Sequence, residues 1–208
     1  MNTKIILDFE TSGLNPYHDD IIEVAMKLSD SSDNFESLIK PKSNEPISQQ
    51  ITNITGITNR MLAENGHEWQ EVYESMNAWL WTIYNFSENN KITIISHNGK
   101  TFDFIFLKRI FSELNNLGIK TIPIKNIIFV DSLLLAKRLI PGRYSYKQSA
   151  LCQTYNIQCE GSHRALNDII ALEKLYKKLC DILNIELNKR RDPYNNPDMI
   201  LDYIKCRI

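Results

Sequence analysis

Four carboxylates that lie far apart in the sequence are candidates for joint chemistry. Asp8 and Glu10 stand two positions apart near the start of the chain. Asp103 lies near its middle, and Asp168 follows His163 by five residues. Clusters of carboxylate oxygens suit hard divalent cations such as Mg²⁺ or Mn²⁺. Two such ions about 3.5–4 Å apart stabilise the attacking and leaving oxygens of a phosphodiester, and a histidine with an ordinary pKa of about 6.5 can deprotonate the attacking water. The set therefore predicts phosphodiester hydrolysis.

The first two acids end a segment that has the pattern of a buried strand. Ile5, Ile6 and Leu7 form a continuous apolar run, as in a central strand that is covered on both faces. Residues i and i+2 of a strand point to the same side, so Asp8 and Glu10 are expected to lie next to each other. Paired carboxylates repel each other unless a cation compensates. The alternative interpretation is a solvent-exposed strand edge.

The other acids also have purely structural interpretations. Asp103 stands at the start of a predicted helix, where a carboxylate complements the helix dipole. Asp168, taken alone, is an ordinary surface acid, and His163 an exposed residue at a helix start. Asp131 follows a predicted strand, and we interpret it as the N-cap of the next helix rather than as a metal ligand.

The elements that must position these residues follow from apolar periodicity and turn signals. Three strands over residues 5–9, 21–28 and 35–39, joined by short turns, predict an antiparallel meander. Helices are predicted next, and then alternate with strands. They cover residues 47–53, 59–63, 68–84, 102–117, 132–139, 146–155 and 163–183, and the later strands cover residues 92–96 and 127–130. This order predicts a mixed sheet with helices packed against it.

Size and composition limit the class of protein. A chain of 208 residues, 43% hydrophobic and 24% charged, suits one domain with a full core. No apolar run approaches the roughly 20 residues that cross a bilayer, and no secretory signal is visible, so we expect an intracellular protein, cytoplasmic or nuclear. None of the four cysteines forms a C-x-x-C pair, which argues against zinc. The net charge of −1 does not exclude nucleic acid, and basic pairs such as Lys137-Arg138 are interpreted as solvated helix faces.

Three segments resemble, in order, the three motifs of the DEDD exonuclease superfamily. They are residues 8–14 (DFETSGL), 96–103 (SHNGKTFD) and 163–168 (HRALND). The histidine five residues before the last aspartate resembles the histidine branch, DEDDh. The resemblance runs from about residue 4 to residue 176. It is greatest to TREX-type exonucleases and to the proofreading epsilon subunit of bacterial DNA polymerase III.

The resemblance implies an α/β protein with the RNase H-like fold, in which helices flank a mixed five-stranded sheet on both faces. It implies a metal-dependent 3′→5′ exonuclease that shortens single-stranded or frayed DNA ends and releases nucleoside 5′-monophosphates. Two Mg²⁺ or Mn²⁺ ions would be held by Asp8, Glu10, Asp103 and Asp168. His163 would be the general base, and Glu10 would also meet the terminal 3′-OH. The substrate-binding residues implied by the resemblance are Thr11, Leu14, Ile54, His97, Asn98 and Phe102.

Several alternatives remain open at this stage. The motifs do not separate DNA from RNA, so an exoribonuclease that acts on RNA 3′ ends is one rival. A non-catalytic binding module is another, although all five chemical positions are filled. Tyr144 and Tyr146 either stack on bases or cover the helix that follows. We expect an exonuclease domain over residues 1–184 and a tail or small terminal helix over 185–208. That tail is either a plain terminus or a segment that docks onto a polymerase, and a second copy of the chain is the other expected partner.

Overall fold

A mixed five-stranded sheet forms the centre of the molecule. The computed structural model describes residues 3–158 and 164–189 of the chain. The strands are β1 (Thr3–Thr11), β2 (Ile21–Leu28), β3 (Asn34–Leu38), β4 (Ile92–Ser96) and β5 (Ile127–Asp131), in the spatial order β3-β2-β1-β4-β5. The first three strands pair antiparallel, whereas β4 is parallel to both β1 and β5. The predicted meander and mixed sheet are therefore confirmed.

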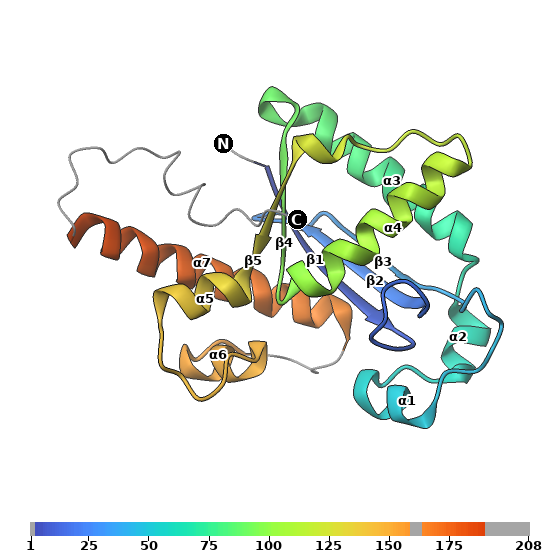
Figure 1. The fold of residues 1–208 in the computed structure, drawn as a ribbon, viewed down its shortest axis with the longest axis horizontal. Coiled ribbons are helices and arrows are strands. Elements are labelled where there is room, and N and C mark those ends of the chain that lie inside the picture. Colours follow the sequence, from blue (N-terminus) through green and yellow to red (C-terminus); the bar gives the residue numbers. More distant parts are fainter. Residues whose placement is uncertain (1–2, 159–163, 190–208) are drawn as a thin grey trace.

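Helices cover both faces of this sheet, as expected (Figure 1). On one face, α3 and α4 pack against the apolar side chains of β1 and β4. On the other, α5, α6 and α7 enclose a second core. The shorter α1 and α2 pack beside β2 through a third, smaller cluster. The bounds are α1 Gln49–Thr55, α2 Asn59–Asn65, α3 Trp69–Phe86, α4 Asp103–Asn116, α5 Ser132–Leu139, α6 Gln148–Thr154 and α7 Ala165–Lys189.

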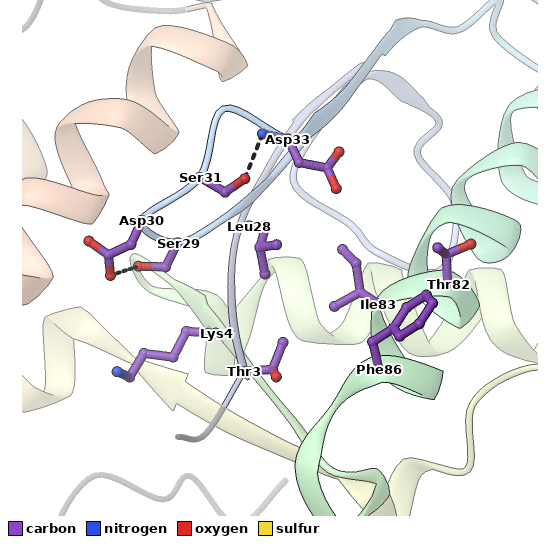
Figure 2. Close-up of a pocket in the computed structure, with 10 residues that line it drawn as sticks. All are labelled: Thr3, Lys4, Leu28, Ser29, Asp30, Ser31, Asp33, Thr82, Ile83 and Phe86. Carbon is purple, nitrogen blue, oxygen red and sulfur yellow. Dashed lines mark hydrogen bonds between the residues drawn. The ribbon is translucent and has the colours of Figure 1, made fainter.

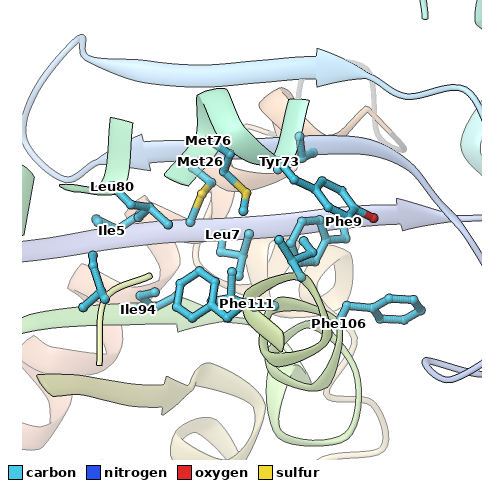
Figure 3. Close-up of a cluster of buried hydrophobic side chains, with 14 of the residues drawn as sticks. Ile5, Leu7, Phe9, Met26, Tyr73, Met76, Leu80, Ile94, Phe106 and Phe111 are labelled. Atoms are coloured by element: carbon cyan, nitrogen blue, oxygen red, sulfur yellow. The ribbon is translucent and has the colours of Figure 1, made fainter. Parts of the chain in front are cut away.

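The pleat of β1 decides where its two carboxylates point. Ile5, Leu7 and Phe9 belong to the core under α3 and α4 (Figure 3), whereas Ile6 belongs to the core under α7. Side chains alternate between the faces of a strand. The residues two and four positions after Ile6, which are the predicted metal ligands of this strand, therefore share its face. The strand directs both carboxylates toward α7.

Local capping explains where two helices begin. Asp131 accepts hydrogen bonds from the backbone N–H groups of Leu133 (2.9 Å) and Leu134 (3.3 Å), which satisfies donors that have no partner within the first turn of α5. The helix-cap interpretation is confirmed. Ser48 caps α1 in the same way, through the N–H of Ile51.

The last described helix differs from the prediction. It begins at Ala165 and continues to Lys189, past the predicted end at Leu183. Packing against the sheet stabilises this helix well past the motif, which ends at Asp168. The buried residues that recur at helical spacing are Leu172, Leu175, Leu179 and Leu183. Most of the predicted tail or small terminal helix, residues 190–208, lies outside the described residues. Within residues 3–158 and 164–189, no helix is long and apolar enough to cross a membrane.

Candidate active site

Three of the four predicted metal ligands meet near the C-terminal end of β1, the central strand of the sheet. Carboxylate oxygens of Asp8, Glu10 and Asp168 all lie within 4.8 Å of one another. The strand supplies two of them through its pleat, and the first turn of α7 supplies the third. In that turn the Asp168 N–H donates to the carbonyl of Arg164 (3.1 Å). We refer to these three residues as the carboxylate cluster.

The fourth predicted ligand, Asp103, comes from the first turn of α4 and is 2% exposed. Its carboxylate accepts hydrogen bonds from the Phe9 N–H (3.2 Å) and from the Ser96 hydroxyl. It is not part of the three-residue group, but its charge is close enough to raise the pKa of Asp8. The loop before α4 is tightly packed, since a Cβ on Gly99 would lie 2.8 Å from the Ser96 Cβ.

The electrostatics of the site follow from burial and mutual repulsion. Burial, and then the charges of Asp103 and Glu10, raise the pKa of Asp8 well above its ordinary value. Burial, and then the charges of Asp168 and Glu23, raise the pKa of Glu10 to about 8. Burial likewise raises the pKa of Asp103 to about 7. A divalent cation offsets such repulsion and favours the ionised carboxylates, so this all-oxygen donor set fits a hard cation.

Glu23 is a residue of the site that the sequence analysis missed. It lies directly opposite Glu10 in the β1–β2 register and is fully buried. Its carboxylate accepts from Arg164 Nε (3.0 Å) and Nη2 (2.8 Å) and from the Ala165 N–H (3.0 Å). It thereby fastens the start of α7, and with it Asp168, to the sheet. The available signal was a single acid within the apolar run of residues 21–26 (IIEVAM).

The predicted general base, His163, lies outside the described residues. Its neighbour in the sequence, Arg164, is the first described residue after the gap and is held by Glu23. The sheet therefore anchors the chain one residue after His163.

Two of the predicted substrate-binding residues are exposed apolar side chains. Leu14, in the loop between β1 and β2, is 84% exposed, and Ile54, on α1, is 49% exposed. Arg109 of α4 fixes that loop, because its Nη1 donates to the carbonyls of Pro16 (2.8 Å) and Asp19 (2.8 Å). The Thr11 hydroxyl, at the end of β1, donates to the Gly13 carbonyl within the same loop (2.6 Å). Arg109, which follows Lys108 in another basic pair of the sequence, is thus a structural anchor and not part of a solvated helix face.

His97 has both ring nitrogens engaged within the protein. Nδ1 lies 2.8 Å from the Ser132 hydroxyl oxygen, and Nε2 lies 2.9 Å from the Tyr146 carbonyl oxygen. Because a carbonyl only accepts, Nε2 carries the proton and Nδ1 accepts from the serine. Burial lowers the pKa of His97, which favours this neutral form. His97 therefore ties the end of β4 to α5 and to the loop before α6, and direct substrate binding by its ring remains a prediction.

The other two predicted substrate residues lie on the loop after β4. Asn98 adopts a left-handed backbone (φ 66°), its N–H donates to Asp131 (3.1 Å), and its side-chain oxygen accepts from the Thr101 hydroxyl (3.0 Å). Phe102 is partly buried, and its ring packs edge-on against Phe106 at 5.0 Å between centroids. Phe102 thus contributes to the core, and its contact with substrate remains a prediction.

A separate pocket of about 500 Å³ lies at the opposite end of β1 (Figure 2). Lys4, Leu28, Ile83 and Phe86 are among the residues that line it, and Phe86 is 88% exposed. None of the carboxylates of the cluster contributes to its lining. This pocket is therefore separate from the carboxylate cluster.

Comparison with known proteins agrees with this geometry. The model of the family RNase_T, described as exonuclease, matches residues 5–176. The PolC-type DNA polymerase III of Thermotoga petrophila is 33% identical over 205 residues, covering 97% of this chain and 14% of that protein. Exonuclease DPD1, chloroplastic/mitochondrial, of Arabidopsis thaliana is 31% identical over 195 residues, covering 89% of this chain and 58% of that protein.

The fold is also that of solved nucleases. The zinc-bound complex of E. coli ExoI with single-stranded DNA superposes with a TM-score of 0.68 at 18% identity, covering 89% of this chain and 43% of that one. The expected RNase H-like fold and the expected resemblance to exonucleases are thus confirmed. The chain spans only between 11% and 14% of the length of its PolC-type relatives.

Proposed function

This chain belongs to the exonuclease family RNase_T, and on that premise we propose that it removes nucleotides one at a time from the 3′ end of a DNA strand. The products are nucleoside 5′-monophosphates, and the reaction uses two divalent cations, Mg²⁺ or Mn²⁺. Single-stranded and frayed ends are the preferred substrates, because unpairing a duplex end costs a few kcal/mol.

The observation that carries the proposal is the carboxylate cluster. Asp8, Glu10 and Asp168 bring oxygens within 4.8 Å of one another at the end of a buried strand. Burial and repulsion raise the pKa values of the first two. A protein tolerates such an arrangement when a cation offsets the repulsion, and hard cations bind carboxylate oxygens.

The residues that would hold the ions are the three of the cluster together with Asp103. When bound, the ions supply charge that stabilises the oxygens of the phosphodiester as its bond breaks. Asp103 also braces the end of β1 through its hydrogen bond with the Phe9 N–H. His163 accepts the proton of the attacking water, which is the task of a base with a pKa near neutrality.

Side chains and backbone around the cluster bind the terminal nucleotide of the substrate. Leu14 and Ile54 offer exposed apolar surface to the terminal base from the β2 side of the site. The backbone near Thr11, at the end of β1, faces the terminal 3′-OH together with Glu10. Arg109 keeps the Leu14 loop in place, so the grip does not depend on ordering that loop when substrate binds.

Digestion of a 5′-labelled single-stranded DNA oligomer tests the proposal. With Mg²⁺ we expect a ladder of shortening products, and with EDTA no ladder. Asp168→Asn and His163→Ala should each reduce the rate by at least about 100-fold. Glu45→Gln, an exposed acid outside the site, is the matched control and should keep full activity. A ladder that persists in EDTA, or in Asp168→Asn, would overturn the mechanism.

Proofreading within a polymerase is a second candidate, favoured by the 33% identity to a PolC-type polymerase over 97% of the chain. Addition of a replicative polymerase would then stimulate hydrolysis of a mismatched primer end more than that of a matched one. Equal stimulation of matched and mismatched ends by the polymerase would argue against this second candidate.

A further inference from the structure

A second pocket, of about 550 Å³, is lined by residues after β4, on α5 and in the loop before α6, and β4 lies on the side of β1 opposite β2. Gln148, one of the residues that line it, donates a hydrogen bond through Nε2 to the backbone carbonyl of Asp168 (2.9 Å). Asn98, which also lines the pocket, follows β4, and β4 pairs directly with β1. Through Gln148, the wall of the pocket therefore contacts the backbone of a residue of the carboxylate cluster.

The chemistry of this pocket differs from that of the cluster beside it. Lys137 and Lys147 line it, and no carboxylate does so among the residues that the structure describes around it. Tyr144 also lines it, with its side chain fully exposed to solvent. Cations and an exposed aromatic ring are the groups that bind the phosphates and the bases of a single strand.

The loop that presents Tyr144 is held on both sides by hydrogen bonds. The Tyr146 hydroxyl donates to the Ile140 carbonyl (2.8 Å) and accepts from the Arg143 N–H (3.2 Å). The Tyr146 carbonyl accepts from His97 (2.9 Å), which is itself anchored on α5 through Ser132. An exposed aromatic on a fixed loop binds a planar ligand at low entropic cost, because its backbone is already ordered.

We propose that this pocket is a subsite for a nucleotide upstream of the scissile phosphate, in which a base stacks on Tyr144 and the two lysines contact backbone phosphates. β5 lies two strands from β1, or about 10 Å at the usual strand spacing. A strand with its 3′ nucleotide against Leu14 and Ile54 would reach the pocket about three nucleotides from the scissile bond, at about 3.4 Å per stacked nucleotide. The subsite rests on the proposed function, because it needs a strand whose 3′ end lies in the cluster.

Equilibrium binding of oligodeoxythymidines of two and eight nucleotides tests the subsite. The Asp168→Asn background with Mg²⁺ keeps the strand intact during the measurement. Tyr144→Ala should raise the Kd of the octamer by roughly 5- to 150-fold, the loss of one stacked base, and should leave that of the dinucleotide unchanged. Tyr144→Phe, which keeps the ring, should bind the octamer like the parent. Phe86→Ala removes an exposed aromatic at the far end of β1 and should have no effect.

The lysines have an independent readout in the salt dependence of binding. Losing two phosphate contacts in Lys137→Ala/Lys147→Ala should lower the slope of log Kd against log salt by about 1.4 for a single strand. Lys91 and Lys125, exposed at the opposite ends of β4 and β5, provide a control double variant with an unchanged slope.

Each other outcome overturns a defined part of the reasoning. Equal losses for dinucleotide and octamer would mean that the loop supports the cluster and is not a subsite. An unchanged octamer Kd in Tyr144→Ala, with the octamer still degraded by the unmodified protein, would remove the subsite and leave the exonuclease intact. An unmodified protein that neither binds nor degrades the octamer would remove both.

Discussion

Replacing one of the proposed metal-binding carboxylates by its amide is expected to stabilise the protein while it removes activity. Glu10 is the most informative position, because burial and the neighbouring charges raise its pKa from 4.5 to about 8. In the absence of cation, the folded state therefore binds a proton that the unfolded state releases between these two values. Stability from this proton is fully present below about pH 4.5 and is lost as the pH rises toward 8.

The size of the effect follows from the same interval. Each pKa unit corresponds to about 1.36 kcal/mol. At pH 7.5, which is about 3 units above the ordinary pKa of Glu10, the raised pKa therefore lowers the stability of the folded state by at most about 4 kcal/mol. Glu10 is only partly buried, and water screens part of this cost. We expect Glu10→Gln to raise the free energy of unfolding in EDTA by about 1–3 kcal/mol at pH 7.5, and by less than about 1 kcal/mol at pH 5.

Thermal unfolding in EDTA at pH 5 and pH 7.5 measures this difference in stability. For a chain of this size, 1 kcal/mol shifts Tm by about 2–4 °C. Burial lowers the pKa of His97, so this residue also makes the stability depend on pH. Because the parent and Glu10→Gln both contain His97, its contribution cancels in their difference. Glu45→Gln should change Tm little at either pH. Addition of Mg²⁺ should stabilise the unmodified protein more than Glu10→Gln. A Glu10→Gln protein that is less stable than the parent in EDTA at pH 7.5 would refute the electrostatic account of the site.

Three other perturbations test the supports of the site. Arg164→Ala leaves the buried Glu23 without its guanidinium partner and should lower the free energy of unfolding in urea by about 2–4 kcal/mol. Glu36→Gln alters a carboxylate 3.8 Å from the same guanidinium and should lower it by less than about 0.5 kcal/mol. Equal losses in the two variants would contradict the anchoring role of Glu23. Arg109→Ala frees the loop that carries the apolar grip and should raise the KM for a single strand several-fold with little change in kcat, and an unaltered KM would contradict this. Asp131→Ala removes the acceptor of four backbone N–H groups and should lower the free energy of unfolding by about 3 kcal/mol, and a loss below about 1 would show that water replaces the cap.

Features fixed by short-range physics were predictable from the sequence. Asp8 and Glu10 share a face because a strand alternates every residue, and no other part of the chain alters that rule. Asp131 caps α5 because its side chain reaches N–H groups only two and three residues away. Successive apolar runs separated by turn residues likewise predicted the antiparallel meander, in which each strand pairs with the next one along the chain.

Contacts between distant segments were decided only by the tertiary structure. Asp168 reaches the cluster because α7 packs on the face of β1 that carries Ile6, and the fully buried Glu23 is tolerated because the same helix brings Arg164 to it. His97, expected to bind substrate, has both nitrogens engaged by groups 35 and 49 residues away. The sequence alone determined the four predicted metal ligands and their order along the chain, but not Glu23. Their partners depend on how helices dock onto a sheet, and that docking is set by the whole apolar surface rather than by any motif.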